Sequence, residues 1–538
     1  MVTVPSSFAA ARRRIVLVVC VLAAVSVSSC QSETGAGSGA VDSGALDAAP
    51  DKPSGSGGSA SGGSGGAVAG SGGATPGSGG AASGGSGTGG AVDAGTSPGS
   101  GGQVGSGGVA ASGGVTGSGG RADAGVMDAA SGSGGAGGRG GGGGTSGTGG
   151  ASAGPSPVTF SKNVRLNDDT GTGRQAEVAM AAGPNGLVIA GWMDERATRV
   201  CAYSFSTDGG LTWSKNVSIP NMTGVFVGDP AVAIDGGGTM YAVCQEYTKS
   251  DGSAGNIRMM TSSDRGVTWS AIATIQSAPD KPWAAGGTDD GTVFVSWLGN
   301  PGGIKRSLDR GLTWGPVQSL GNIIHGTGIT PSNTGLVHVP FNLDSNRNQL
   351  RYLRSKDNGG TWEAPRDLIP DMGTFCFSCN PRQHPIVGSA ADPTGRYVAI
   401  TWASTMPAGQ GDDDVWLMYS KDSGDTWTQP IRVNDNTSPS RQFESWVAVD
   451  AHGAVHVAWT DYRDNGQDET FYARSADPTK GFEKNIQVTD GHGSGNTDFL
   501  GDYKGIVVQG ADVLVVWQDT RRDSGDIYFS RAAGAAGP

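Results

Sequence analysis

Short runs of alternating apolar and polar residues fill the last two thirds of the chain, and turns that contain Gly or Asp separate them. One stretch shows the whole pattern, with runs at 444–450, 455–459, 470–475 and 486–490. Alternation with a period of two, together with β-branched residues and Gly or Asp turns, is typical of antiparallel strands. The pattern therefore predicts an all-β region built from units of four short strands, which are the blades of a β-propeller.

The turn before the last strand of each unit repeats the phrase Ser-x-Asp-x-Gly-x-Thr-Trp. Its copies begin at Ser206, Ser262, Ser307, Ser355 and Ser420, and a degenerate copy follows at 475–482. Repeats of roughly 45 to 65 residues are typical of propellers and solenoids, in which one unit cannot bury its apolar face alone. Residues 158–538 are therefore expected to form one propeller domain.

Equivalent serines end the third strands and count the blades. These serines are Ser206, Ser262, Ser307, Ser355, Ser420, Ser475 and Ser530. Seven is the predicted number of blades, and six with one divergent extra unit is the alternative. The seventh unit lacks a fourth strand, whereas the segment 163–168 resembles the fourth strands at 431–435 and 486–490. We expect this N-terminal segment to complete the seventh blade and close the ring, because closure protects edges that an open sheet leaves unpaired.

The Asp of the repeated turn has a structural explanation. Its carboxylate can accept hydrogen bonds from turn amides, Gly supplies a positive φ, and the Trp packs near the outer edge of the blade. These Asp-box residues are Asp208, Asp264, Asp309, Asp357 and Asp422. The turns join strands three and four, so a site on the propeller axis is expected on the opposite face.

The N-terminus has the pattern of an export signal. Three arginines precede an apolar run at 15–27 that is too short for a comfortable membrane span, which is typical of a signal peptide. Its end, Val27-Ser28-Ser29-Cys30, resembles the bacterial lipobox. The resemblance implies a signal peptide at 1–29, lipidation of Cys30 and, with Gln31 next, a lipid anchor in the outer membrane or at the cell surface. An ordinary signal peptide with an incidental Cys is the alternative.

Composition separates the propeller from this anchor. Residues 30–157 are mostly Gly, Ser and Ala and contain no aromatic residue. Such a segment cannot bury enough apolar surface to offset the entropy of ordering, so it is predicted to be a disordered tether. The net charge of −12 argues against a nucleic-acid partner, because phosphate binding needs a basic face.

Four cysteines remain beyond the signal and the anchor. In an exported protein they are disulfide candidates first. Cys376 and Cys379 are expected to close a small loop, whereas the pairing of Cys201 and Cys244 stays open.

Charged residues recur where the innermost strands begin. Four acids lie 15 positions before an equivalent Trp or Cys of the second strand: Glu177, Asp229, Glu444 and Asp502. Arginines recur beside them in two patterns. Those of Trp-x-Asp-x-Arg are Arg196, Arg463 and Arg521, and those that precede a Gln are Arg174, Arg382 and Arg441. These groups form either a binding site near the axis or ion pairs that join one blade to the next. A Ca²⁺ ion held by the central acids is a further hypothesis; no metal ligand set and no other cofactor is expected.

The Asp boxes and the blade pattern, over about residues 158–538, resemble the sialidase (neuraminidase) superfamily of BNR or Asp-box repeat proteins. The resemblance implies three arginines for the substrate carboxylate, a Tyr nucleophile activated by a Glu, and an Asp acid/base. It assigns the nucleophile to Tyr503, its partner to Glu444, and carboxylate binding to Arg174, Arg196 and Arg463. The repeat pattern adds Arg382, Arg441 and Arg521 as further candidates for substrate binding. The chain departs from the family pattern because Arg174 is followed by Gln-Ala rather than Ile-Pro, and because Glu444 and Tyr503 fall in consecutive blades.

Two functions are compatible with these features. One is a surface-anchored, sialidase-like glycosidase that acts on acidic glycans. The alternative is a non-catalytic propeller that binds a glycan or a protein and is displayed on the lipid-anchored tether. Both predict an exported monomer. The expected partner is a glycan or a cell-surface polysaccharide, and the alternative also admits a protein.

Overall fold

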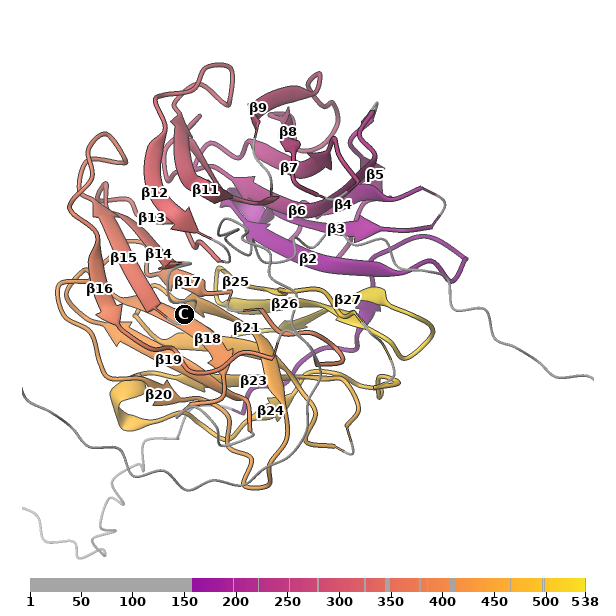
Figure 1. The fold of residues 1–538 in the computed structure, drawn as a ribbon. Helices are drawn as coiled ribbons and strands as arrows, with labels where there is room; N and C mark the ends of the chain where they lie inside the picture. The colour runs from indigo at the N-terminus through magenta and orange to yellow at the C-terminus, as the bar shows by residue number, and fades with distance from the viewer. Residues whose placement is uncertain are drawn as a thin grey trace, which may run out of the picture. The chain divides into compact units, whose positions relative to one another are not determined.

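The computed structural model describes residues 157–537 apart from short gaps. The gaps are at 197, 221, 251, 278–279, 324–325, 344–348, 377–378, 385, 407–411, 465, 496 and 498. The predicted signal peptide, Cys30 and the tether lie outside the described residues. The described chain forms seven antiparallel sheets arranged in a ring around one axis, as predicted (Figure 1).

Each sheet is formed by consecutive strands, except that the last sheet also takes in β1. The first four sheets are β2 (Gln175–Ala182), β3 (Val188–Asp194), β4 (Val200–Ser206) and β5 (Val217–Ser218); β6 (Phe226–Ile234), β7 (Met240–Tyr247), β8 (Gly255–Ser262) and β9 (Ala273–Ser277); β10 (Asp280–Gly286), β11 (Val293–Ser307) and β12 (Gln318–Ile323); β13 (Thr330–Pro331), β14 (Val337–Leu343), β15 (Gln349–Ser355) and β16 (Arg366–Ile369). The other three are β17 (Gly388–Ala391), β18 (Val398–Ser404), β19 (Asp414–Ser420) and β20 (Ile431–Arg432); β21 (Gln442–Val449), β22 (Val455–Asp461), β23 (Glu469–Ser475) and β24 (Ile486–Gln487); β25 (Gly505–Gln509), β26 (Asp512–Asp519), β27 (Asp526–Ala532) and β1 (Val164–Arg165). Two 3₁₀ turns, η1 (Pro184–Gly186) and η3 (Pro478–Lys480), lie in connections.

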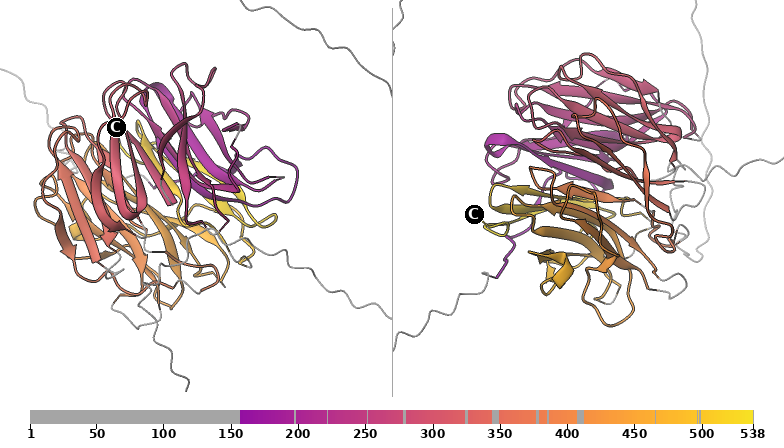
Figure 2. Two further views of the ribbon diagram at one scale, coloured as in Figure 1. Left: turned by 45° about the horizontal axis from the view of Figure 1, so that its top comes forward. Right: turned by 90° about the vertical axis from the view of Figure 1, so that its left-hand side faces the viewer.

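The first described strand closes the ring. β1 pairs antiparallel with β27, with Val164 opposite Phe529 and Arg165 opposite Tyr528. The last sheet lies against the first, since β25 and β26 both contact β2, and the views of Figure 2 show these two sheets side by side. The prediction of seven blades closed by the N-terminal segment is confirmed, and the six-blade alternative is wrong.

The third sheet departs from the four-strand pattern in one detail. β11 is one unbroken strand whose first part pairs with β10 and whose second part pairs with β12. A Cβ atom on Gly303 would lie 2.7 Å from the ring of Trp297, so the two parts of β11 lie side by side. This strand therefore supplies both the second and the third position of its blade.

The core lies between sheets rather than within one of them. Seven of the apolar clusters in the described chain span neighbouring sheets around the ring, and one of these seven also takes in Trp283 and Tyr503 near the axis. One of them contains the disulfide between Cys201 of β4 and Cys244 of β7, which links the first two blades. A second disulfide joins Cys376 and Cys379 in the loop that precedes β17.

The Asp boxes are closed by their own hydrogen bonds. In each of the five copies the Ser hydroxyl donates to the Asp carboxylate at 2.7 to 2.8 Å, and the Thr amide and hydroxyl donate to the same carboxylate. The bond from the Thr268 hydroxyl is the main reason why the pKa of Asp264 falls to about 2. The box glycines also leave room for the preceding blade, because a Cβ atom on Gly266 (φ 87°) would lie 2.2 Å from the Phe205 ring.

The boxes share a face with the hairpins between first and second strands. Gly209 of the first box donates its amide to the carbonyl of Gly186 in the β2–β3 hairpin at 2.9 Å, and Asn358 donates to Gly335 in the same way at 2.7 Å. We call this the Asp-box face, and the other the opposite face. The innermost strands begin at the opposite face.

Within the described ranges, no helix is long and apolar enough to cross a membrane.

Candidate functional site

The innermost strands place charged residues at the axis by a repeated backbone irregularity. Glu177, Asp229, Lys281 and Glu444 have φ angles of 56°, 48°, 40° and 51°, in the left-handed region. The strand register shifts at each of these positions. A β-bulge redirects a side chain, and a non-glycine residue with positive φ costs about 1 to 2 kcal/mol. The surrounding contacts therefore hold these four residues in place.

A lysine lies at the centre of this charged group. The Lys281 ammonium is 2.7 Å from Asp502, 3.0 Å from Asp229 and 3.7 Å from Glu177, and the lysine side chain is 1% exposed. Three of the four acids that we aligned by sequence therefore surround one cation. We call Lys281 with Glu177, Asp229 and Asp502 the axial ion cluster.

Asp502 also faces the loop that follows the Cys376–Cys379 disulfide. Arg382 donates to Asp502 at 2.9 Å, and His384 lies 3.8 Å from it. Burial alone would raise the pKa of Asp502, but the charges of His384, Lys281 and Arg382 hold it well below its ordinary value. Asp502 is therefore an ionised carboxylate.

Glu444 lines a small pocket on the opposite face, together with Asp502 of the axial ion cluster. Its Oε2 accepts a hydrogen bond from Thr460 at 2.7 Å, and its Oε1 is buried without a hydrogen-bond partner among the described residues. Burial raises the pKa of Glu444 to about 8, against the opposing effect of Lys504. The pocket encloses about 10 Å³, and its walls include Arg382, His384, Glu444 and Asp502. We call these four residues the acid pocket.

Tyr503 does not line the acid pocket. Its side chain is 3% exposed, and its hydroxyl donates to the carbonyl of Pro230 at 3.2 Å. Its ring packs against Trp283 and Trp446, with centroids 4.7 and 6.4 Å away. Burial raises the pKa of Tyr503 well above its ordinary value. The structure thus does not bring the Tyr and the Glu of the sialidase resemblance together.

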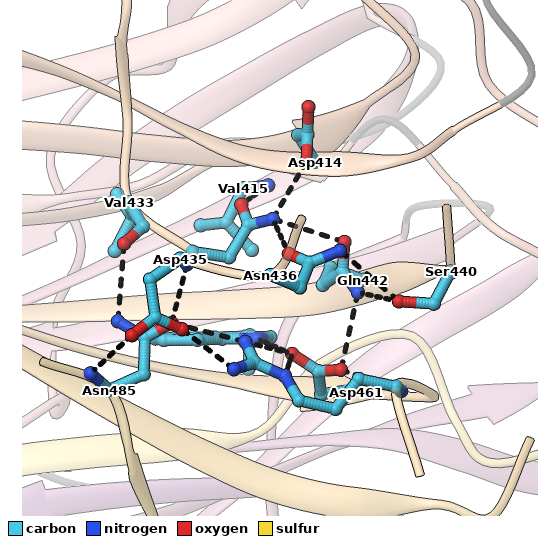
Figure 3. Close-up of polar contacts among 12 residues, drawn as sticks. Asp414, Val415, Val433, Asp435, Asn436, Ser440, Gln442, Asp461 and Asn485 are labelled. Carbon is cyan, nitrogen blue, oxygen red and sulfur yellow. Dashed lines mark hydrogen bonds and ion pairs between the residues drawn. The ribbon is translucent and has the colours of Figure 1, made fainter. Parts of the chain in front are cut away.

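The arginines of Trp-x-Asp-x-Arg join neighbouring blades. Arg463 donates to Asp461 of its own blade at 2.8 Å and to Asp435 of the preceding blade at 2.7 Å. Asp435 also exchanges two backbone-to-side-chain hydrogen bonds with Asn485, as Figure 3 shows. The same arrangement recurs at two further junctions, with Arg196 between Asp194 and Asp168, and Arg521 between Asp519 and Asp490. This is the blade-to-blade ion pairing considered from the sequence.

The remaining predicted arginines lie around the mouth of the axis on the opposite face. Arg174 pairs with Glu195 at 3.2 Å, and Arg441 pairs with Asp413 at 3.3 Å. Arg174 and Arg382 both stack on Phe499, with guanidinium carbons 5.0 and 4.6 Å from the ring centroid. Phe499 is partly exposed. We call Arg174, Arg382 and Phe499 the Arg–Phe platform.

A separate axial cavity of about 340 Å³ opens on the Asp-box face. The innermost strands β2, β6, β10, β17, β21 and β25 line it, together with β13 and the residues just before it. Trp283 and Trp446 lie in its wall.

Sequence reasoning missed Lys281, Phe499 and the axial cavity. Lys281 lies 16 positions before Trp297, one position away from the offset that identified the acids, so an alignment that admitted either charge could have found it. In the described chain no group of three or more His, Cys, Asp or Glu side chains could hold a metal ion. The Lys281 ammonium lies beside Asp229 and Asp502, two of the acids that the Ca²⁺ hypothesis treats as ligands.

Comparisons with known proteins give low similarity. No family model matches the chain. A xyloglucanase from a Paenibacillus species is 28% identical over 203 residues, which are 35% of this chain and 18% of that protein. The chain thus matches less than a fifth of the length of this relative.

Solved structures with a similar fold include carbohydrate-acting enzymes. The α-L-arabinanase of Penicillium chrysogenum complexed with arabinobiose is 12% identical, with 71% of this chain and 100% of that chain covered and a TM-score of 0.42. A Hadza microbial sialidase is 16% identical, with 59% and 66% covered and a TM-score of 0.38. At such low identity and TM-score, these likenesses say nothing about the activity of this chain.

Proposed function

We propose that this protein recognises carbohydrate on the opposite face, at the Arg–Phe platform. One observation carries the proposal: a partly exposed aromatic ring lies within 5.0 Å of two guanidinium groups, and one of these, Arg382, also lines the acid pocket. Aromatic rings stack on the apolar faces of sugars, while Arg and carboxyl groups exchange hydrogen bonds with their hydroxyls. Because Arg174 and Arg382 already pair with Glu195 and Asp502, the finer expectation of an acidic glycan gains no support from the geometry.

Replacement of the platform ring is expected to weaken binding. We expect Phe499→Ala to reduce glycan affinity about twofold to tenfold, because an aromatic contact contributes about 0.5 to 1.5 kcal/mol. A glycan array followed by calorimetry on the best ligand measures this change. Leu312→Ala, at a side chain 83% exposed on the Asp-box face, is the control and should bind like the wild type. Equal affinity of Phe499→Ala and the wild type would place the glycan elsewhere.

Glycoside hydrolysis is a second candidate, and the acid pocket favours it. A carboxyl that keeps its proton and a carboxylate that stays ionised are the two groups that glycoside hydrolysis requires. Glu444 would donate a proton to the leaving oxygen, and Asp502 would orient a water by accepting a hydrogen bond from it. The pocket volume of about 10 Å³ suits a single water molecule.

The acid role of Glu444 predicts a pH profile. We expect Glu444→Gln to lower turnover of aryl glycosides at least about 100-fold, since a positioned general acid contributes this much. Wild-type turnover should fall as pH rises through about 8, because Glu444 then loses the proton that it must donate. Glu483→Gln, on an exposed ion pair with Arg474, should keep full turnover. If the purified protein binds glycans but hydrolyses none, it is a binding propeller only.

Surface display is the third part of the proposal, and it rests on the lipobox resemblance of Cys30. Cys30→Ala is expected to move the protein from the membrane fraction to the soluble exported fraction and to abolish labelling by a clickable palmitate. Cys20→Ala, within the predicted signal peptide, is the matched control and should stay membrane-bound. Membrane retention of Cys30→Ala would show that the chain is held by another means.

A further inference from the structure

We propose that the axial cavity on the Asp-box face is a second ligand site, and that it takes an uncharged polyhydroxylated molecule such as a neutral sugar or a sugar alcohol. This inference does not rest on the proposed function. The described residues that line the cavity include no member of the acid pocket or of the Arg–Phe platform. The two sites can therefore be tested separately.

The position of the cavity follows from its walls. It is lined by the later residues of the innermost strands, including Ala182, Gly286 and Ala391, which end β2, β10 and β17. These three residues are partly exposed, so the cavity is open at the Asp-box face. Its volume of about 340 Å³ lies at the lower end of the range for small-molecule sites, roughly 300 to 1,000 Å³.

Charge is nearly absent from the walls. Among the described residues that line the cavity, Lys504 is the one ionisable side chain. Its ammonium donates to the hydroxyls of Thr460 and Thr470 at 2.6 and 3.3 Å, so it is engaged within the protein. A charged ligand would lose its hydration here without gaining a counter-ion, which disfavours acids and amines.

Polar groups nevertheless surround the ligand space. Each innermost strand is an edge strand of its sheet, and no described strand pairs with its axial side. Backbone amides and carbonyls on such an edge need hydrogen-bond partners from outside the sheet. The hydroxyls of Thr330 and Ser389 add a polar patch, with their oxygens 2.9 Å apart. A purely apolar ligand would leave these groups unsatisfied.

The inner end of the cavity is aromatic. The rings of Trp283 and Trp446 lie 5.1 Å apart with an angle of 34° between their planes, and both line the cavity. Indole rings pack well against the C–H faces of a sugar ring. The cavity therefore favours a neutral polyol over an acid, an amine or a hydrocarbon. Its strand edges can pair with hydroxyls, its two indole rings can pack on a sugar ring, and its walls are uncharged.

The test compares ring molecules that differ in charge and polarity. The full-length protein is titrated by calorimetry with glucose, myo-inositol, glucuronate and cyclohexanol, and saturation-transfer NMR reports which protons contact the protein. We expect glucose or inositol to bind with a dissociation constant in the millimolar range, about 1 to 20 mM, and the other two to bind at least about tenfold more weakly.

Two wall variants fill the cavity from different blades. Ala285→Leu and Ala391→Leu should each weaken the binding of the neutral probe at least about tenfold, because added side-chain volume occupies the ligand space. Val267→Leu, at a side chain 80% exposed on the same face, should have no effect. Melting temperatures identify any variant that fails to fold, and Trp446→Phe then provides a third test, since it removes an indole from the inner end.

Several results would overturn the proposal. Absence of glucose and inositol binding up to about 100 mM is one, and unchanged affinity in both folded wall variants is another. Equal or tighter binding of glucuronate or cyclohexanol would reject the ligand class. Loss of the same binding in Phe499→Ala would move the site to the Arg–Phe platform, so failure here is distinguishable from failure of the proposed function.

Discussion

Lys281→Met is expected to destabilise the propeller by about 3 to 5 kcal/mol, or to prevent its folding. The change removes the ammonium that lies within 3.0 Å of Asp229 and Asp502 and 3.7 Å from Glu177. Loss of one partner from a buried ion pair leaves uncompensated charge in a medium of low polarity, which costs about 3 to 5 kcal/mol. Urea unfolding followed by tryptophan fluorescence measures the loss.

The pH dependence of this variant provides a second readout. In the wild type the pKa of Asp502 is held below its unfolded value, so this group adds stability above that value and loses it as pH falls through the folded pKa. Without Lys281 the folded pKa should rise, and the variant should regain stability as pH falls from about 8 to 5, where the carboxyl can take up a proton. Lys480→Met, at a side chain 82% exposed, should change stability by less than about 0.5 kcal/mol. A loss of similar size in both variants would mean that the axial ion cluster contributes little.

The Cys201–Cys244 disulfide is expected to contribute about 4 kcal/mol to stability. It closes a loop with a sequence separation of 43 and joins two blades inside a buried cluster. In the chain-entropy description, a cross-link across a loop of this length restricts the unfolded chain by about 4 kcal/mol. The double variant Cys201→Ala/Cys244→Ala should therefore unfold at clearly lower denaturant concentration than the wild type.

The second disulfide is an internal control for loop length. Cys376 and Cys379 are separated by 3 positions, so the same description gives only about 2 kcal/mol. We expect Cys376→Ala/Cys379→Ala to show about half the loss of the other pair in parallel unfolding curves. The reverse order would show that the short loop supports the fold through the segment that carries Arg382 and His384.

The sheets could be predicted because their signals are local. Period-two alternation and the Asp-box phrase lie within one blade, and the resemblance of 163–168 to other fourth strands is visible in the sequence alone. The structure confirms both the number of blades and the pairing of β1 with β27.

The contacts among charged residues at the axis were harder to predict, because the residues that meet there are far apart in the sequence. Lys281 meets Asp502 across 221 positions, and the repeated spacing that marks Asp502 does not mark Lys281. Arg463 could bind a ligand or form an ion pair with the neighbouring blade, and the sequence is compatible with both. The position of Asp435 in space decides between them. The orientation of Tyr503 likewise depends on Trp283 and Trp446, which come from two other blades.

Because β1 closes the ring, the propeller can complete its folding only after the last sheet is available. Val164 must find Phe529, so the first strand of the propeller stays without its partner until nearly all of the polypeptide has been synthesised and, if exported, translocated. Contacts of such long sequence separation slow folding, because a large loop must close before they form. A molecule interrupted before the last sheet would expose an unpaired strand and the apolar side of its first blade, a surface that chaperones and proteases recognise.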